Sequence, residues 1–274
     1  MPYFEHDEDL PVLVQELPEG ERWVYRQVFN QIYRRWRAYG RHDEEASYLE
    51  AARQAAEATK ILERHPVAGR VTISRTIHRV VPERTSPQAE IWWAQFMELH
   101  PGWKFQTWRD PLDPRVFPIT SPYWERCENG AQLADLVRME VLLKYGGFYV
   151  DSDVQPLRSF EPLVRLGGVA AWEDAKAVPN AVMGFSAGHP ALAAVLDLSL
   201  ARVPGPTWWS GVGAYTAILP ARADVELLSP MTFYPVHYKD PDRERKLAEA
   251  DAERYPLSFS VHHYAGSWLR RKAS

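Results

Sequence analysis

Two aspartates separated by one residue, Asp151 and Asp153, are the side chains of this sequence best placed to do chemistry. They directly follow the apolar run FYV at 148–150, which is typical of a short buried strand. Side chains two residues apart on an extended strand point to the same side, so both carboxylates can address one cation. Hard divalent ions such as Mg²⁺ and Mn²⁺ prefer oxygen ligands of this kind. The alternative is that both acids only end the strand and open a turn before Pro156.

The helix predicted just before this strand carries a second polar pair. Asp135 and Arg138 are three residues apart and therefore share a helix face. Gly146 supplies the positive φ that ends the helix, and Gly147 lets the chain reverse tightly into the strand. In open α/β sheets, ligands bind outside the carboxyl ends of the strands, which is where the two aspartates are expected. Taken alone, Asp135 and Arg138 could equally be a plain intrahelical ion pair.

The run from Ala131 to Leu157, AQLADLVRMEVLLKYGGFYVDSDVQPL, resembles the signature of the DXD-containing sugar transferases. That family includes the Golgi initiating mannosyltransferases, bacterial capsule and polysaccharide transferases and, more distantly, the large glucosylating toxins. The resemblance implies a GT-A fold, which is an α/β architecture with a Rossmann-like mixed sheet flanked by helices. It also implies a nucleotide-diphosphate-sugar donor, an Mn²⁺ or Mg²⁺ ion, and transfer of a hexose with retention of anomeric configuration.

The resemblance also assigns roles to residues of this run. Asp135, Arg138 and Tyr149 match positions that contact the sugar and ribose of the donor. Asp151, Asp153 and Arg138 are the predicted catalytic residues, with Asp151 also counted among those that bind the donor. In this mechanism the cation neutralises the diphosphate as the glycosidic bond breaks.

Other segments are similar to further parts of the family signature. The strand predicted over 70–81 places His78 at the histidine of the opening I-P-K-x-I-H-x-x-W motif, with Val81 where relatives have tryptophan. By this resemblance His78 is expected to be one of the residues that bind the donor. Asn180 begins an N-x-x-M-G segment and could hydrogen-bond the transferred sugar or the acceptor, or only cap a loop. Trp208 and Trp209 lie in a segment similar to T-G-P, and could form an acceptor platform or pack within a helix.

The end of the chain is similar to the family's closing H-H-W-x-x-S-W motif. Adjacent residues on a strand face opposite ways, so only one of His262 and His263 should point at the metal. His263 is the predicted third ligand, because a late histidine followed by an aromatic residue and a glycine completes the ion's shell in many GT-A enzymes. An imidazole beside two carboxylates suits Mn²⁺ better than Mg²⁺. Trp268 is expected to bind the donor and exclude water.

Composition restricts the remaining possibilities. The chain of 274 residues is 46% hydrophobic with a net charge of −4, which disfavours nucleic acid as its principal partner. Cys127 is the single cysteine, so no internal disulfide can form. No stretch approaches the ~18 apolar residues of a transmembrane helix, and the acidic N-terminus does not resemble a signal peptide. These features predict a cytoplasmic location.

The chain divides into two predicted parts. Residues 1–66 read as an extended arm followed by helices, an extension with no counterpart in the family signature. Residues 67–274 are the predicted GT-A domain, in which strand, helix and strand from 70 to 108 indicate a parallel sheet. The proline-rich segment from Asp110 to Pro122 is expected to be an irregular excursion over the active site.

Two other functions stay open. FYVDSDV at 148–154 also matches the strand and D-x-D-x-[TV] of haloacid-dehalogenase-like phosphotransferases, in which Asp151 would be the nucleophile and Asp153 the acid/base. A non-catalytic sugar-binding module of the same fold is the third possibility. The acceptor is not indicated: polysaccharide, glycolipid, small molecule, protein and modified nucleic-acid base are all compatible with the sequence.

Overall fold

The computed structural model describes residues 15, 72–174 and 176–266. Apart from Gln15, the helical extension expected over 1–66 lies outside the described residues, and so does Trp268. The predicted division into two parts therefore stays a prediction. Among the described residues, no helix combines the length and the apolar character needed to cross a membrane.

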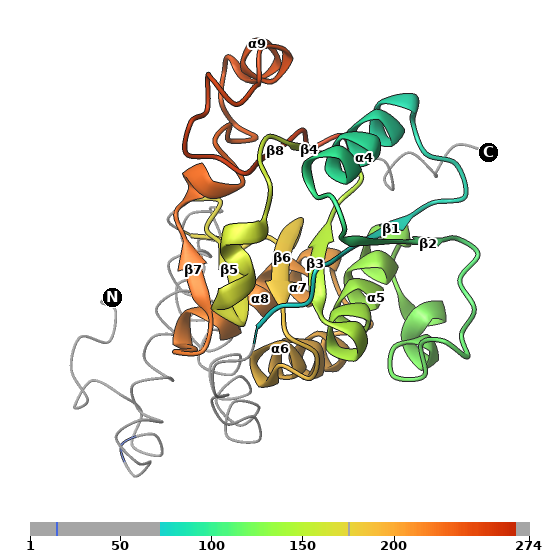
Figure 1. Ribbon diagram of the computed structural model, residues 1–274. Coiled ribbons are helices and arrows are strands. Elements are labelled where there is room, and N and C mark those ends of the chain that lie inside the picture. Colours follow the sequence, from blue (N-terminus) through green and yellow to red (C-terminus); the bar gives the residue numbers. More distant parts are fainter. Residues whose placement is uncertain (1–14, 16–71, 175, 267–274) are drawn as a thin grey trace.

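The described chain is built on a mixed six-stranded sheet with helices on both faces (Figure 1). The strand order is β2-β1-β3-β6-β5-β7. β6 runs antiparallel to both neighbours, β3 and β5, whereas the other pairs are parallel. The strands are β1 Thr76–Val81, β2 Lys104–Arg109, β3 Gly147–Val150, β5 Gly168–Ala171, β6 Val182–Phe185 and β7 Glu226–Leu228. The predicted α/β class, a mixed sheet flanked by helices, is confirmed.

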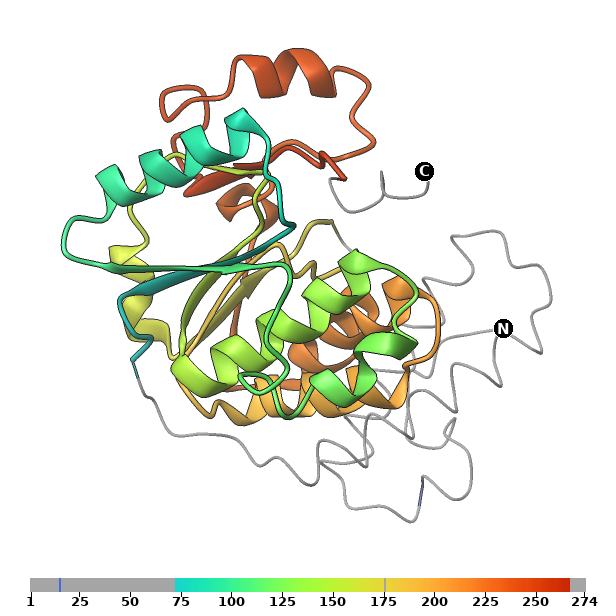
Figure 2. The same cartoon turned by 90° about the vertical axis from the view of Figure 1, so that its right-hand side faces the viewer.

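The helices form a layer on each side of this sheet (Figure 2). One face is covered by α5 Gly130–Tyr145, α6 Pro190–Ala201, α7 Thr207–Ser210 and α8 Val212–Ile218, and the other by α4 Pro87–Leu99. A hydrophobic core lies on each side of the sheet, and side chains along β3 alternate between the two. Tyr149 packs in the core on the α5 side, whereas Phe148 and Val150 pack in the core on the α4 side. β3 is buried along its whole length, which explains why its sequence is apolar without alternation.

The junction between α5 and β3 is formed by local sequence. Asn129 caps the start of α5, where its side chain accepts a hydrogen bond of 3.0 Å from the Gln132 N–H. Gly146 ends the helix with a φ of 61°, as predicted. Gly147 has a φ of 104°, and a Cβ there would lie 2.5 Å from the Thr76 carbonyl oxygen. Only glycine therefore lets the chain enter β3 directly from the helix.

A second, two-stranded sheet brings the end of the described chain to the aspartates. β4 Val154–Pro156 pairs antiparallel with β8 Ser260–His262, and Val154 is opposite His262. The backbone N–H of His263 also donates to the Asp153 carbonyl, at 2.9 Å. Within residues 72–174 and 176–266, the remaining elements are α9 Arg243–Ala248 and four 3₁₀ helices, at Ser121–Arg126, Glu161–Leu166, Leu219–Ala221 and Pro230–Thr232.

The segment from Asp110 to Pro122 differs from the expectation. It packs against the side of α5 instead of covering the aspartates. The backbone N–H groups of Ile119 and Thr120 donate to the buried carboxylate of Glu140, at 3.0 and 2.8 Å, and Phe117 enters the core. A buried carboxylate needs such donors, so Glu140 anchors this segment away from the cleft described below.

Candidate active site

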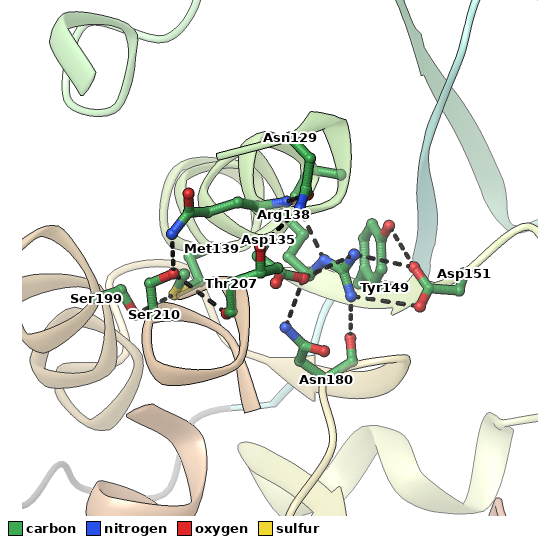
Figure 3. A network of polar contacts seen from close by, with 12 residues as sticks. Asn129, Asp135, Arg138, Met139, Tyr149, Asp151, Asn180, Ser199, Thr207 and Ser210 are labelled. Carbon is green, nitrogen blue, oxygen red and sulfur yellow. Dashed lines mark hydrogen bonds and ion pairs between the residues drawn. The ribbon is translucent and has the colours of Figure 1, made fainter. Parts of the chain in front are cut away.

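Arg138 is the centre of a buried polar network that joins α5 to the ends of β3 and β6 (Figure 3). Its Nη2 pairs with Oδ1 of Asp135 and Oδ1 of Asp151, each at 3.1 Å. Its Nη1 donates to the Asn180 carbonyl at 2.7 Å and to Asp151 Oδ2 at 3.4 Å, and its Nε donates to the Ala134 carbonyl at 3.2 Å. The guanidinium also lies over the Tyr149 ring, 4.5 Å from its centroid.

This arrangement changes the role expected of Arg138. A guanidinium has five N–H groups, and Arg138 has five interior acceptors within 3.4 Å. Its side chain is almost fully buried, and although Arg138 lines the cavity described below, its N–H groups point at these acceptors. In this structure Arg138 therefore pairs with the carboxylates of Asp135 and Asp151.

The charges of the network perturb each other. Burial raises the pKa of Asp135 to about 6, although Arg138 works in the opposite direction. Burial also raises the pKa of Asp151, again opposed by Arg138. Burial alone would lower the pKa of Arg138, but Asp151, Tyr149 and Asp135 together raise it above its ordinary value. One buried cation therefore sits between two acids that burial makes reluctant to ionise.

Asp151, Asp153 and His262 form a group that could hold a metal ion, since one ligand atom from each lies within 4.8 Å of the others. His262 Nε2 is 3.2 Å from Asp153 Oδ1, and the Ala265 N–H donates to Asp153 Oδ2 at 2.7 Å. Burial by itself would raise the pKa of Asp153, but His262 and the Ala265 N–H lower it to about 2. Burial likewise opposes charge on His262, yet Asp153 raises the pKa of the imidazole.

The donor set fits a divalent cation. Two carboxylates and one imidazole are ligands that Mn²⁺ accepts readily. The Nδ1 atom of His262 is buried and has no hydrogen-bond partner among the described atoms, so no hydrogen bond from Nδ1 to these atoms holds the ring in place.

His263, the histidine predicted to bind the metal, points elsewhere. Its Nε2 is 2.9 Å from Gln155 Oε1, and its ring packs against Trp92 of α4 at a centroid distance of 4.3 Å. Burial there lowers the pKa of His263 to about 4. The rule that adjacent strand residues face opposite ways holds, but the pairing of β4 with β8 turns His262 toward Asp153.

Tyr149 and His78, both expected to contact the donor, are buried. The Tyr149 hydroxyl donates to Asp151 Oδ1 at 2.9 Å, so this residue supports the acid from within the core. His78 is only 2% exposed, and its Nε2 lies 3.0 Å from the Gly146 carbonyl. The Trp108 indole N–H donates to His78 Nδ1 at 3.3 Å. Neither side chain lines the cleft, which differs from the expectation.

Asn180 and Gly211 define the surroundings of Asp135. The Asn180 amide donates to Asp135 Oδ1 at 2.8 Å, and Asn180 also lines the cleft. Gly211, at the junction of α7 and α8, lies directly against the other carboxylate oxygen, because a Cβ there would be 2.3 Å from Asp135 Oδ2. The sequence contains no local signal for this contact, since the two residues are 76 positions apart.

A cavity of about 400 Å³ opens over these groups. Tyr264 lines it in a left-handed conformation with a φ of 54°, which is uncommon for a residue other than glycine. The cavity brings together acids, an amide, a histidine and aromatic rings: it is lined by Ala131, Asp135, Arg138, Asp151, Ser152, Asp153, Asn180, Thr207, Trp208, Val212, His262, Tyr264 and Gly266. Thr207 and Val212 had no expected role in the site, and Tyr264 and Gly266 were expected only as parts of the motif that follows His263.

Comparison with known proteins agrees with the motif in this cleft. Residues 90–167 match the family described as "Glycosyltransferase sugar-binding region containing DXD motif". This segment contains α5, β3 and both aspartates of the Asp-Ser-Asp motif. The resemblance to DXD-containing sugar transferases is therefore confirmed.

Two of the relatives have names that state a sugar transfer. The chain is 33% identical to inositol phosphoceramide mannosyltransferase 3 of Schizosaccharomyces pombe over 105 residues, which are 36% of this chain and 29% of that protein. It is 22% identical to a human alpha-1,4-N-acetylglucosaminyltransferase over 144 residues, 47% of this chain and 41% of the relative. The matches thus span less than half the length of these relatives. Among solved structures, the PaToxG glycosyltransferase is similar with a TM-score of 0.48 and 15% identity, over 75% of this chain and 85% of that one.

Proposed function

We propose, on the premise that residues 90–167 are the DXD-containing sugar-binding region of a glycosyltransferase, that this protein transfers a hexose from a nucleotide-diphosphate donor with the help of a divalent cation. The observation that carries the proposal is the group of Asp151, Asp153 and His262 at the carboxyl end of β3, facing a cavity. This is the edge at which α/β sheets bind their ligands. Mn²⁺ suits the mixed oxygen and nitrogen donors.

Asp153, Asp151 and His262 would hold the cation. When bound, such an ion supplies positive charge that stabilises a diphosphate leaving group. Asp151 can serve as a fixed ligand because Arg138 and the Tyr149 hydroxyl hold its carboxylate in place. A ligand held in this way loses little entropy on binding.

The polar groups beside the metal group would orient the transferred sugar. Asp135 and Asn180 both line the cavity and are joined by a hydrogen bond of 2.8 Å. An amide and a carboxylate can together accept from and donate to vicinal hydroxyls. Retention of anomeric configuration is proposed from the family resemblance, and attack on the same face of the sugar is the corresponding route.

The phosphotransferase alternative is disfavoured by the surroundings of Asp151. A nucleophilic carboxylate needs an oxygen free to attack. Oδ1 of Asp151 accepts from the Tyr149 hydroxyl and pairs with Arg138, and Oδ2 also faces Arg138.

Thermal denaturation of the full chain with Mn²⁺, alone and with UDP or GDP, tests the proposal. A ligand that binds only the folded state at 100 times its Kd stabilises that state by about 2.7 kcal/mol. We expect a Mn²⁺-dependent rise in Tm with one of the two nucleotides, and loss of that rise in Asp153→Asn with folding retained. The control is Asp113→Asn, an acid outside the cavity that pairs with Arg115. The proposal is wrong if Asp153→Asn keeps the full metal-dependent rise.

That experiment detects binding and leaves catalysis to a second measurement. With the nucleotide identified, the corresponding nucleotide sugars are incubated with protein and Mn²⁺, and the released nucleoside diphosphate is quantified. Release of the diphosphate is expected from wild type and not from Asp153→Asn. A wild-type protein that binds the nucleotide sugar without releasing diphosphate, with or without acceptor sugars, would instead be the non-catalytic sugar-binding module.

A further inference from the structure

The backbone turn from His262 to Ala265 wraps around Asp153. The His263 N–H donates to the Asp153 carbonyl oxygen at 2.9 Å, and the Ala265 N–H donates to Asp153 Oδ2 at 2.7 Å. The Nε2 atom of His262 lies 3.2 Å from Oδ1 of the same carboxylate. The surroundings of this acid therefore depend on where the turn is held.

The strands beside this turn are too short to hold it by themselves. β4 and β8 have three residues each, and Pro156 has no N–H to donate to Ser260, its partner in the pair. Tyr264 follows with a φ of 54°, a left-handed conformation that a residue other than glycine keeps only where its surroundings fix it. Side-chain contacts are therefore needed to set the register of β8.

The side chain of His263 contacts both elements next to β8. Its ring packs against Trp92 of α4, with a centroid distance of 4.3 Å and an interplanar angle of 34°. Its Nε2 is 2.9 Å from Oε1 of Gln155, the residue of β4 that pairs with Val261. Figure 1 shows α4 beside the two-stranded sheet, where these contacts lie. We refer to Trp92, Gln155 and His263 as the His263 cluster, which connects β8 to β4 and to α4.

A further hydrogen bond fixes which atom of this cluster carries the proton. The Gln155 amide nitrogen donates to the Ala250 carbonyl oxygen at 2.9 Å, so the amide oxygen is the atom that faces His263. An amide oxygen only accepts hydrogen bonds, and therefore His263 Nε2 is the donor. A protonated ring nitrogen has no lone pair for a cation, so this nitrogen holds the strand and does not bind the metal.

We propose that His263 is a positioning residue of the metal group, because its contacts hold β8 in the register that turns His262 toward Asp153. This inference rests on the proposed function, since it takes the group of Asp151, Asp153 and His262 as the site of the cation. Replacing a residue that orients a metal ligand typically weakens metal binding by about 10–100-fold. When the His263 cluster is broken, β8 can separate from β4, and the His262 imidazole then moves away from the Asp153 carboxylate.

Titration of the full chain with MnCl₂, with unbound Mn²⁺ measured by EPR spectroscopy, tests the proposal. We expect His263→Ala to bind Mn²⁺ about tenfold more weakly than wild type. His263→Phe keeps a ring against Trp92 and should lose less affinity. Trp92→Leu should also bind more weakly. Trp103→Leu is the matched control: Trp103 packs against His100 at a centroid distance of 4.7 Å, outside the two-stranded sheet, and its replacement should leave the affinity unchanged.

Pulsed EPR of the Mn²⁺-loaded protein separates positioning from ligation, because it detects a nitrogen nucleus bound directly to the ion. At saturating Mn²⁺, the imidazole nitrogen signal should persist in His263→Ala and disappear in His262→Ala. The reverse result would overturn the proposal, since His263 would then be the ligand.

Hydrogen exchange followed by NMR examines the turn in the absence of any metal. The His263 and Ala265 N–H groups both donate to Asp153 and should be protected in wild type. In His263→Ala they should exchange faster, while the N–H groups of α5 keep their protection. Equal protection of the turn in both proteins would contradict the positioning role.

The outcomes distinguish this inference from the proposed function. Equal Mn²⁺ affinity in wild type and His263→Ala would overturn the inference and leave the proposed transfer in place. Equal losses in Trp92→Leu and Trp103→Leu would overturn it as well, because any loss of packing would then weaken the site. Mn²⁺ binding that depends on His263, in a protein without a nucleotide-dependent Tm rise, would support the positioning role and remove the proposed transfer. A wild-type protein that does not bind Mn²⁺ would overturn both.

Discussion

Replacing Arg138 tests whether the centre of the polar network is a structural cation. In Arg138→Gln, two buried carboxylates, Asp135 and Asp151, lose their shared counter-charge. Removing one partner of a buried ion pair typically costs about 3–5 kcal/mol. For a domain of this size the corresponding fall in Tm is on the order of 10 °C. Arg138→Lys keeps the charge but has three donors for five acceptors, so its loss should be smaller.

The pH dependence of the stability lost in Arg138→Gln follows from the pKa values of Asp135 and Asp151. The pKa of Asp135 is already raised to about 6 with Arg138 present, and without that cation the pKa values of Asp135 and Asp151 rise further. The folded variant then holds protons that the unfolded chain, with ordinary carboxyl pKa values near 4, has released. Where the folded state binds more protons, the free energy of unfolding falls as pH rises. Arg138→Gln should therefore be most destabilised at pH 8 and recover part of its stability at pH 5.

Urea unfolding followed by tryptophan fluorescence at pH 5 and pH 8 measures both effects. Arg115→Gln is the matched control, since Arg115 is an exposed arginine paired with Asp113, and no change is expected for it at either pH. A variant Arg138→Gln as stable as wild type at pH 8, or equally destabilised at both pH values, would show that Arg138 is not the counter-charge of two buried acids.

Two further variants test the neighbourhood of the site. In Gly211→Ala the new Cβ would lie 2.3 Å from Asp135 Oδ2, so we expect the Asp135 carboxylate to shift. The protein should then lose about 1–3 kcal/mol of stability, and sugar transfer should weaken. An unchanged Tm and an unchanged kcat/KM would contradict the contact. Burial lowers the pKa of His78 to about 4, whereas the unfolded chain takes up this proton near pH 6.5, so the free energy of unfolding should fall as pH drops from 6.5 to 4. This contribution is at most about 3 kcal/mol, and urea titrations of His78→Gln should show a shallower fall than wild type; identical slopes would contradict it.

The local part of the site could be predicted because it is contiguous in sequence. The glycine stop at Gly146 and the apolar strand before Asp151 are each defined by a few neighbouring residues. The predicted order of strand, helix and strand from 70 to 108 also matches β1, α4 and β2. The α/β class follows from this order of elements, and the long motif carried the family resemblance.

The hydrogen-bond and ion-pair partners of the buried site residues were harder to predict. The sequence gives the type of a polar residue, but it does not say whether the side chain faces a ligand or the core. Arg138 reads as a fork for a donor, yet its acceptors come from α5, from the end of β3 and from the loop before β6. His78 and Tyr149 lie on strands whose direction was predicted, but the packing of α5 over those strands buries both side chains. Only the assembled sheet decides which strand face is covered.

The sequence by itself thus determined the α5–β3 unit, the two aspartates at its end and the requirement that one of two adjacent histidines faces them. Tertiary structure decided which histidine it is. Asp153 and His262 are 109 residues apart, and the side of β8 that meets β4 depends on a register set by pairing. A shift of one residue would have presented His263 instead. The same reason applies to Gly211 and Trp208, whose places beside Asp135 come from the packing of α7 and α8 against α5.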